Sequence, residues 1–268
     1  MKLLEQGAAH RPILEWPSLN GSDQVDAIAE EMPVALIYNG LSQAVMMASP
    51  VNLAAFGLGF SLSEGIIDGP EQLYGIDVTL SEASAEIALE IATRQFERLK
   101  QMRRTLTGRS GCGLCGKDSL DQIRRVMPPV SGPFTVTHSA IQRATTNLAR
   151  HQPLQGLTGA VHGAAWCALD GSIMMVCEDV GRHNALDKLI GSLWRENCLQ
   201  GPGFLLMSSR ASYEIVQKAA KAGIAVVATL SAPTSMAIDL AAAAGMTLIG
   251  FARESRHLAY SHAHRLTN

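Results

Sequence analysis

The stretch GFLLMSSRASYEIVQKAAKAGIAVVATLSAPTSMAIDLAAAAGMTLIGFAR, residues 203–253, alternates short apolar runs with longer segments of helical periodicity. The apolar runs have the length of buried strands, and the segments between them have the length of helices. The preceding stretch SIMMVCEDVGRHNALDKLIGSLWREN, residues 172–197, has the same pattern. Repeated strand–helix units of this kind are typical of an α/β fold with a mostly parallel sheet.

The first half of the chain is organised differently. Two apolar runs flank Asn39-Gly40 in PVALIYNGLSQAVMMASP, residues 33–50, which predicts a β-hairpin. The apolar stretch that follows Pro50 predicts a buried helix ending near Gly65. Alternating patterns in residues 75–92 predict two further strands, and a helix-prone segment follows them.

These patterns divide the chain into three parts. We expect a flexible tail over residues 1–20 and a smaller mixed α+β domain over residues 21–130, which ends in a mobile loop with two cysteines. A C-terminal α/β domain over residues 131–268 would bind the ligand.

The bulk composition excludes several classes of function. There are 22 basic and 24 acidic side chains, so no overall positive field recruits nucleic acid or an anionic membrane surface. The N-terminus lacks the apolar core of a signal peptide, and no apolar run approaches the ~20 residues of a membrane span. Five cysteines without a framework spacing fit a reducing compartment, so we expect a cytoplasmic protein.

Polar side chains follow each of the four strands predicted in residues 172–253. In a parallel sheet the carboxyl ends of the strands meet at one edge, where ligands bind. Hydroxyl groups and free N–H groups at helix starts, together with arginine side chains, can bind phosphate. The acidic pair after the first strand could accept hydrogen bonds from the N–H donors of a guanine base. Each cluster alone is explained by caps and surface ion pairs, but four at one edge favour a phosphorylated or nucleotide-like ligand. The clusters are Glu178, Asp179, Arg182, His183 and Asn184; Ser208, Ser209, Arg210 and Ser212; Ser231, Thr234 and Ser235; and Arg253, Glu254 and Arg256.

The loop TGRSGCGLCGKDS, residues 107–119, carries Cys112 and Cys115 among glycines. Zinc takes four ligands in most structural sites and this pair supplies two, so we expect no zinc. Thioredoxin-like exchange usually places such a pair at the start of a helix, which this loop does not do. The third possibility is a mobile thiol that accepts sulfur and carries it to a second partner. The glycines would let the loop reach both partners, and the nearby basic residues would favour the thiolate form. The remaining thiols, in apolar or helical contexts, are predicted to be buried: Cys167, Cys177 and Cys198.

Several motifs together resemble the FdhD family of sulfur carriers that formate dehydrogenase requires. They are CGLCG, EDVGRHNALDKLIG, SRASYEIVQKAAKAGI, SAPTSMAIDLA, GMTLIGFAR and, upstream, MMASPVNLAAFGLGFSLSEGII. The resemblance implies a cytidine-deaminase-like C-terminal domain without its zinc, and usually a homodimer. It implies a sulfurtransferase that accepts persulfide sulfur from a cysteine desulfurase and sulfurates the molybdenum bis(guanine dinucleotide) cofactor for formate dehydrogenase, with GDP as a mimic of that cofactor.

The resemblance also assigns roles to residues of this chain. Cys112 would carry the persulfide, with Cys115 as the second thiol of the catalytic loop. The cofactor-contact segment would comprise Phe251, Ala252, Arg253, Glu254, Ser255 and Arg256, and the residues at the strand ends add Arg182, His183 and Arg210 to the expected cofactor site.

The chain departs from the expected family pattern at Arg109, Ala160 and Ser209, which puts the fine geometry of the ligand site in question. Two other functions remain open at this point. One is a non-catalytic chaperone that holds the cofactor or the apo-enzyme, and the other is a dithiol oxidoreductase.

Overall fold

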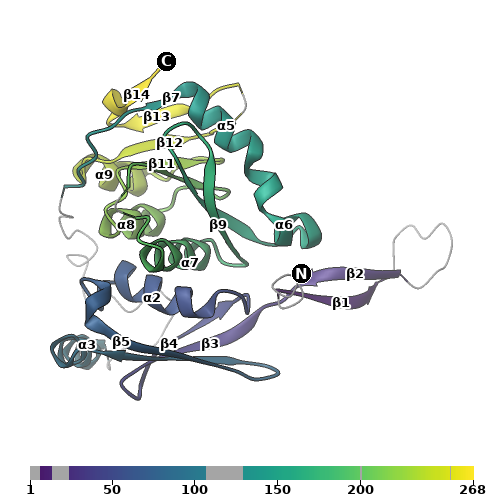
Figure 1. The fold of residues 1–268 in the computed structure, drawn as a ribbon, viewed down its shortest axis with the longest axis vertical. Coiled ribbons are helices and arrows are strands. Elements are labelled where there is room, and N and C mark those ends of the chain that lie inside the picture. The colour runs from purple at the N-terminus through teal and green to yellow at the C-terminus, as the bar shows by residue number, and fades with distance from the viewer. Residues whose placement is uncertain (1–6, 14–23, 107–128, 200, 254) are drawn as a thin grey trace.

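The structure, a computed structural model, describes residues 7–13, 24–106, 129–199, 201–253 and 255–268. Two main sheets, one of six strands and one of four, lie on either side of a layer of helices (Figure 1). The predicted α/β class is confirmed, and the cytidine-deaminase-like arrangement of the C-terminal part stays a prediction.

The six-stranded sheet has the strand order β13-β12-β11-β10-β8-β9. Its strands are β8 (His162–Cys167), β9 (Ile173–Asp179), β10 (Phe204–Met207), β11 (Val226–Thr229), β12 (Thr247–Gly250) and β13 (Leu258–Ser261). Strand β8 pairs antiparallel with both β9 and β10, so β9 to β12 all run in one direction. The expectation of a mostly parallel sheet was wrong in its pairings, because only β10–β11 and β11–β12 are parallel. A tight turn at Gly171 (φ 83°) folds β8 back against β9, and the strand–helix pattern gave no sign of this hairpin.

Helices cover both faces of this sheet (Figure 1). One face carries the crossover helices α7 (Arg182–Arg195), α8 (Tyr213–Lys221) and α9 (Ser235–Ala243). The other face carries α5 (His138–Leu148) and α6 (Pro153–Thr158), joined by η2 (Ala149–His151). Since each crossover joins strands that run the same way, all four strand ends with polar residues reach one edge of the sheet. The short pair β7 (Val136–Thr137) and β14 (Leu266–Thr267), with η3 (Ala263–Arg265), completes this half.

The four-stranded sheet has the order β4-β3-β6-β5. It contains β3 (Met32–Tyr38), β4 (Leu41–Ala48), β5 (Leu73–Leu80) and β6 (Ala85–Ile91), with α2 (Leu53–Ser63), η1 (Pro70–Gln72) and α3 (Thr93–Leu106) between or after them. The predicted hairpin is confirmed: β3 and β4 pair antiparallel, and both Asn39 (φ 46°) and Gly40 (φ 80°) have left-handed backbone. The predicted buried helix is confirmed as α2.

Helices α2 and α7 pack together between the two sheets (Figure 1). Their backbones touch at Gly59 and Gly191, where a Cβ on either residue would overlap a main-chain carbonyl of the other helix, at Asp187 or Ala55. Helix α2 is apolar on nearly all sides because it contacts both its own sheet and α7. One hydrophobic cluster therefore extends through both sheets and the helices between them.

A two-stranded ribbon projects from the body (Figure 1). Strand β1 (Ala8–Ile13) pairs antiparallel with β2 (Gln24–Ala29), so residues 8–13 of the segment expected to be a tail are a strand. The division into domains stays a prediction. Within the described ranges, every helix is too short or too polar to cross a bilayer.

A buried polar network fixes the start of α7 against the end of β4. The Asp179 carboxylate is fully buried and pairs with Lys188 Nζ at 2.5 Å. It also accepts hydrogen bonds from the Ser49 N–H (3.0 Å) and the Gly181 N–H (2.7 Å), while Lys188 donates to the Ser49 carbonyl (2.9 Å). These contacts hold the loop between β9 and α7, and therefore the residues that begin α7, in one position.

Candidate functional site

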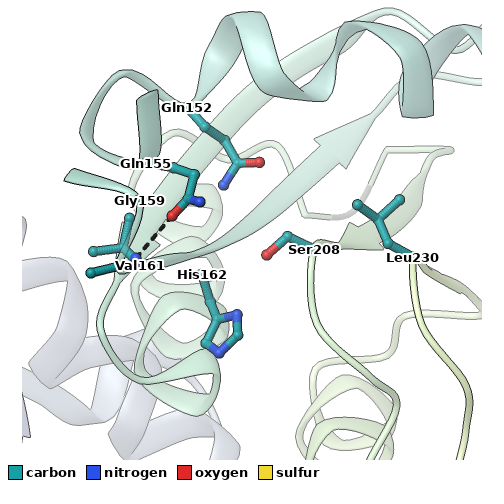
Figure 2. A pocket seen from close by; sticks show the side chains of 8 residues that line it. Gln152, Gln155, Gly159, Val161, His162, Ser208 and Leu230 are labelled. Atoms are coloured by element: carbon teal, nitrogen blue, oxygen red, sulfur yellow. Dashed lines mark hydrogen bonds between the residues drawn. The ribbon is translucent and has the colours of Figure 1, made fainter. Parts of the chain in front are cut away.

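Two neighbouring cavities open at the edge of the six-stranded sheet where β9 to β12 end and β8 begins. They share His162 and Ser208. The first, here called the arginine cavity, has a volume of ≈ 550 Å³ and is lined by His162, Arg182, Ser208, Ser209, Arg210, Ser231, Ala232, Pro233 and Thr234. The second, here called the amide cavity, has a volume of ≈ 470 Å³ and is lined by Gln152, Gln155, Gly159, Ala160, Val161, His162, Ser208 and Leu230 (Figure 2).

The arginine cavity is strongly cationic. Arg182 is the first residue of α7 and Arg210 follows β10, and no carboxylate is among the described residues that line the cavity. Burial lowers the pKa of Arg182, and the charge of Arg210 lowers it further, although the charge of Glu214 acts in the opposite direction. The Nε atom of Arg182 is buried without a hydrogen-bond partner. Two guanidinium groups held close together with a donor left free fit an anion such as a phosphate.

His162 lies at the start of β8, between the two cavities. Burial lowers its pKa, and the nearby charges of Arg182, His183 and Arg210 lower it further, although Asp179 acts in the opposite direction. The imidazole is therefore neutral near pH 7 and can donate from one ring nitrogen and accept at the other. No motif in the sequence predicted this residue. The signal that could have found it is the strand HGAAWC, which brings its first residue to the edge where the other strands end.

The hydroxyl groups at this edge have two different uses. Ser212 caps α8 by accepting from the Ile215 N–H, and Thr234 caps α9 by accepting from the Ala237 N–H. These two hydroxyl groups therefore act as helix caps, which was the alternative to a ligand contact. Ser208 Oγ accepts from the Gly163 N–H (2.9 Å) and still has its own proton to donate. Ser209, one of the departures, has no positive φ, so its side chain causes no backbone strain.

The acidic pair at the end of β9 does not face a ligand, which corrects the expectation that it could read guanine. Glu178 accepts the Leu154 N–H (2.9 Å) and the Gln155 N–H (2.8 Å) at the start of α6. Burial raises the pKa of Glu178, and these N–H groups oppose that shift. Asp179 is engaged in the buried network with Lys188. Sequence spacing could not show the N–H groups of Leu154, Gln155 and Ser49, because they come from segments that precede β9 in the chain.

His183 lines neither of the two cavities. Its Nε2 lies 2.9 Å from the Glu214 carboxylate and 3.3 Å from Ser212 Oγ, at the start of α8. The structure therefore brings Arg182 and Arg210 together among the predicted site residues, and leaves His183 outside their cavity. Its role toward a ligand stays a prediction.

The predicted cofactor-contact segment follows β12, beside the arginine cavity. The Phe251 N–H donates to the Ser231 carbonyl (3.2 Å), and the Ala252 N–H donates to the Thr229 carbonyl (3.0 Å). Phe251 has left-handed backbone (φ 50°), and Ala252 is buried. Three members are exposed and none lines either cavity: Arg253, Ser255 and Arg256. Glu254 lies outside the described residues.

The thiols divide into two groups. Cys112 and Cys115, like Arg109, lie outside the described residues. Cys167 and Cys177 are buried as predicted, and burial raises the pKa of both. The prediction for Cys198 was wrong, because it is exposed in the turn after α7. Among the described residues no three His, Cys, Asp or Glu side chains gather to hold a metal ion.

Comparison with known proteins decides the relationship that these motifs suggested. The model of the FdhD/NarQ family matches residues 29–267. The chain belongs to the FdhD/NarQ family. Relatives include the sulfur carrier protein FdhD of Acinetobacter baylyi, which is 49% identical over 88% of this chain and 86% of its own. The protein of the same name from Variovorax paradoxus is 45% identical over 95% of this chain and 92% of its own.

The fold of this FdhD/NarQ chain also occurs in a solved structure. A crystal structure described as a formate dehydrogenase accessory protein from Desulfotalea psychrophila superposes with a TM-score of 0.75. It covers 97% of this chain and 99% of its own, at 21% sequence identity. At that identity the likeness shows a shared fold, and the arguments about the site rest on the residues of this chain.

Proposed function

We propose that this FdhD/NarQ member is a sulfurtransferase of formate dehydrogenase maturation, which takes sulfur from a cysteine desulfurase and delivers it to the molybdenum bis(guanine dinucleotide) cofactor. The name sulfur carrier protein FdhD, given to relatives that match most of the chain, supports the carrier role. Formate dehydrogenase and the desulfurase are the proposed partners, and the protein acts in the cytoplasm as a homodimer.

Sulfur is accepted by the thiol of Cys112, in the loop with two cysteines. The thiolate of Cys112 attacks the outer sulfur of the persulfide on the desulfurase. The desulfurase cysteine leaves as a thiolate, and the outer sulfur remains on Cys112 as a new persulfide. One S–S bond forms as another breaks, so the step needs no external oxidant. Cys115 is the second thiol of the same loop.

The observation that carries the cofactor proposal is the pairing of Arg182 and Arg210 in one cavity. Their mutual repulsion is relieved when an anion lies between them, and the free Nε of Arg182 supplies a donor for it. The neutral His162 and the Ser208 hydroxyl add donors from the adjoining wall. A dinucleotide cofactor carries pyrophosphate groups, and the arginine cavity has the charge and the hydrogen-bond donors to hold one of them.

The carrier step is tested by the intact mass after incubation with cysteine and desulfurase. The wild-type chain should gain about 32 Da, the mass of one sulfur, and Cys112→Ser should gain nothing. A loss of about 2 Da would instead indicate a disulfide and an oxidoreductase, and an unchanged mass would indicate a non-catalytic chaperone.

The cofactor site is tested by titrating GDP into wild type and Arg182→Met/Arg210→Met. Each charge-assisted hydrogen bond contributes about 1.5–3 kcal/mol, so removing both arginines should weaken binding by about 100-fold or more. Arg143→Met is a suitable control, since its side chain is 57% exposed on α5 and outside both cavities. Equal GDP affinity in wild type and double variant would remove the phosphate site from this cavity.

A further inference from the structure

Helix α3 concentrates positive charge in a chain that is acidic overall. Thr93–Leu106 contains five basic residues and one glutamate, whereas the whole chain has 22 basic and 24 acidic side chains. The helix leads directly into the loop that carries Cys112 and Cys115. The positive charge is therefore placed next to the proposed sulfur carrier. The basic residues of α3 are Arg94, Arg98, Lys100, Arg103 and Arg104.

One of these residues, Arg98, holds α3 against the body of the protein. Its Nη2 donates to the carbonyls of Gly65 (2.8 Å) and Ile66 (2.9 Å), and its Nη1 donates to the Asp68 carboxylate (3.1 Å). Leu99 is buried, so one side of the helix packs on the core. The helix lies at the periphery, at one end of the four-stranded sheet, and its other side is presented to solvent (Figure 1).

The solvent side of α3 carries charge that the fold does not use. Arg94, Glu97 and Gln101 are exposed, and helical spacing places residue 104 on the same side, so these three and Arg104 are here called the α3 stripe. Glu97 pairs with Lys100. Arg94 lies in the first turn, where the helix dipole disfavours a cation, and no carboxylate of the described residues pairs with it. Helix stability therefore does not explain a cation at residue 94.

The α3 stripe is close to the proposed carrier thiol along the chain. Cys112 follows Leu106 by six residues, which span at most about 20 Å when fully extended. Helix α3, with 14 residues, is itself about 21 Å long. A protein bound to the α3 stripe would therefore lie within reach of Cys112.

The chemistry of the stripe fits an acidic protein surface better than a membrane or a nucleic acid. A helix that binds a bilayer needs a free apolar face, but Gln95 and Leu99 of α3 are buried against the body of the protein. Nucleic acid is usually bound by a broad basic field, whereas Glu97 interrupts the stripe and the chain has a net charge of −2. A few cations beside a reactive loop are sufficient to orient an acidic partner.

We propose that the α3 stripe docks an acidic surface of the protein that donates sulfur, and so brings the persulfide of that protein to Cys112. This inference rests on the proposed function, because it requires a cysteine desulfurase as the donor. Sulfur then passes by the same thiolate attack, in which one S–S bond forms as another breaks and the donor cysteine leaves as a thiolate. Arg94 and Arg104 are docking residues and take no part in the transfer itself.

The test measures the initial rate of sulfur loading at increasing desulfurase concentration, by intact mass. At about 0.1 M salt, Arg94→Glu/Arg104→Glu should raise the concentration for half-maximal rate by about tenfold or more. The difference should shrink at about 0.5 M salt, where the charges are screened. Arg94→Lys/Arg104→Lys keeps the charge and should load like wild type. Arg143→Glu/Arg150→Glu makes the same change of charge on α5 and η2, and should also load like wild type.

A small donor separates docking from chemistry. Glutathione persulfide needs no docking surface, so wild type and Arg94→Glu/Arg104→Glu should take up its outer sulfur at equal rates, with a gain of about 32 Da. Slower uptake by the variant would show that the arginines act on the thiol, and would overturn docking. Equal loading of the two proteins by desulfurase at low salt would overturn this inference and leave the carrier function intact.

Two further outcomes are decisive. Wild type that gains sulfur from neither donor overturns the proposed carrier function itself. Binding of anionic vesicles or duplex DNA that is lost in Arg94→Glu/Arg104→Glu, with unchanged loading, overturns the assignment to a protein partner. Circular dichroism confirms that each variant is folded. Arg94→Glu alone keeps the test decisive if the double variant unfolds, since the helix dipole favours an acidic residue in the first turn.

Discussion

Replacing Lys188 by Met should destabilise the protein strongly, because it leaves the Asp179 carboxylate buried without its cation. Both side chains are 0% exposed, and the Nζ–Oδ2 distance is 2.5 Å. Removing one partner of a buried pair costs about 3–5 kcal/mol. Asp179 keeps the N–H donors of Ser49 and Gly181, which partly compensate its charge, so we expect the lower end of that range, about 3 kcal/mol. For a chain of this size that corresponds to a fall in melting temperature of about 6–12 °C.

Urea unfolding followed by circular dichroism measures this difference. Asp179→Asn/Lys188→Met removes both charges and should recover most of the loss, which gives a coupling energy of about 2 kcal/mol or more in a double-mutant cycle. Lys100→Met is the control, since Lys100 pairs with Glu97 at the surface of α3 and its loss should change stability by less than about 0.5 kcal/mol. A cost below about 1 kcal/mol for Lys188→Met, or simple additivity in the cycle, would refute the claim that this network fixes the start of α7.

Three further predictions concern the site. Cys112→Ser should abolish activation of formate dehydrogenase without changing GDP affinity, and Cys115→Ser should be milder; wild-type activation by Cys112→Ser would contradict the assigned carrier. Arg253→Ala/Arg256→Ala should lower GDP affinity by less than about tenfold, because these exposed side chains do not line the cavities, yet reduce activation, in which the larger cofactor must bind. Burial and nearby cations lower the pKa of His162 in the folded state, so the unfolded chain binds the proton more readily and stability should fall as pH drops below about 6.5. In urea unfolding, His162→Gln should lose less stability than wild type between about pH 7.5 and 5.5. An identical pH dependence of stability in the two proteins would refute the lowered pKa of His162.

Local patterns in the sequence predicted much of the fold. The Asn39-Gly40 turn requires two residues with left-handed backbone, and these residue types adopt it readily. The strand–helix units from residue 172 onward were also recognisable, since each apolar run is bounded by caps and turns. The position of β8 was not, because a short strand inserted antiparallel between two others depends on pairing rather than on its own pattern.

The candidate site was predictable to the extent that strand direction determines it. Arg182 and Arg210 reach one cavity because β9 and β10 run the same way, as the strand–helix pattern predicted. The acidic pair was assigned wrongly because the N–H donors to Glu178 lie in α6 and one of those to Asp179 lies just after β4, and neither segment adjoins β9 in the sequence.

The most direct test of the account follows labelled sulfur from the carrier to the cofactor. Wild type and Arg182→Met/Arg210→Met are each charged with ³⁵S by desulfurase and labelled cysteine, then mixed with the molybdenum bis(guanine dinucleotide) cofactor, and the label is measured in the protein and in the released cofactor. Both proteins should acquire the label, and only wild type should transfer it. Label that stays on wild type, or that leaves the double variant equally fast, would contradict delivery of sulfur to a cofactor held in the arginine cavity.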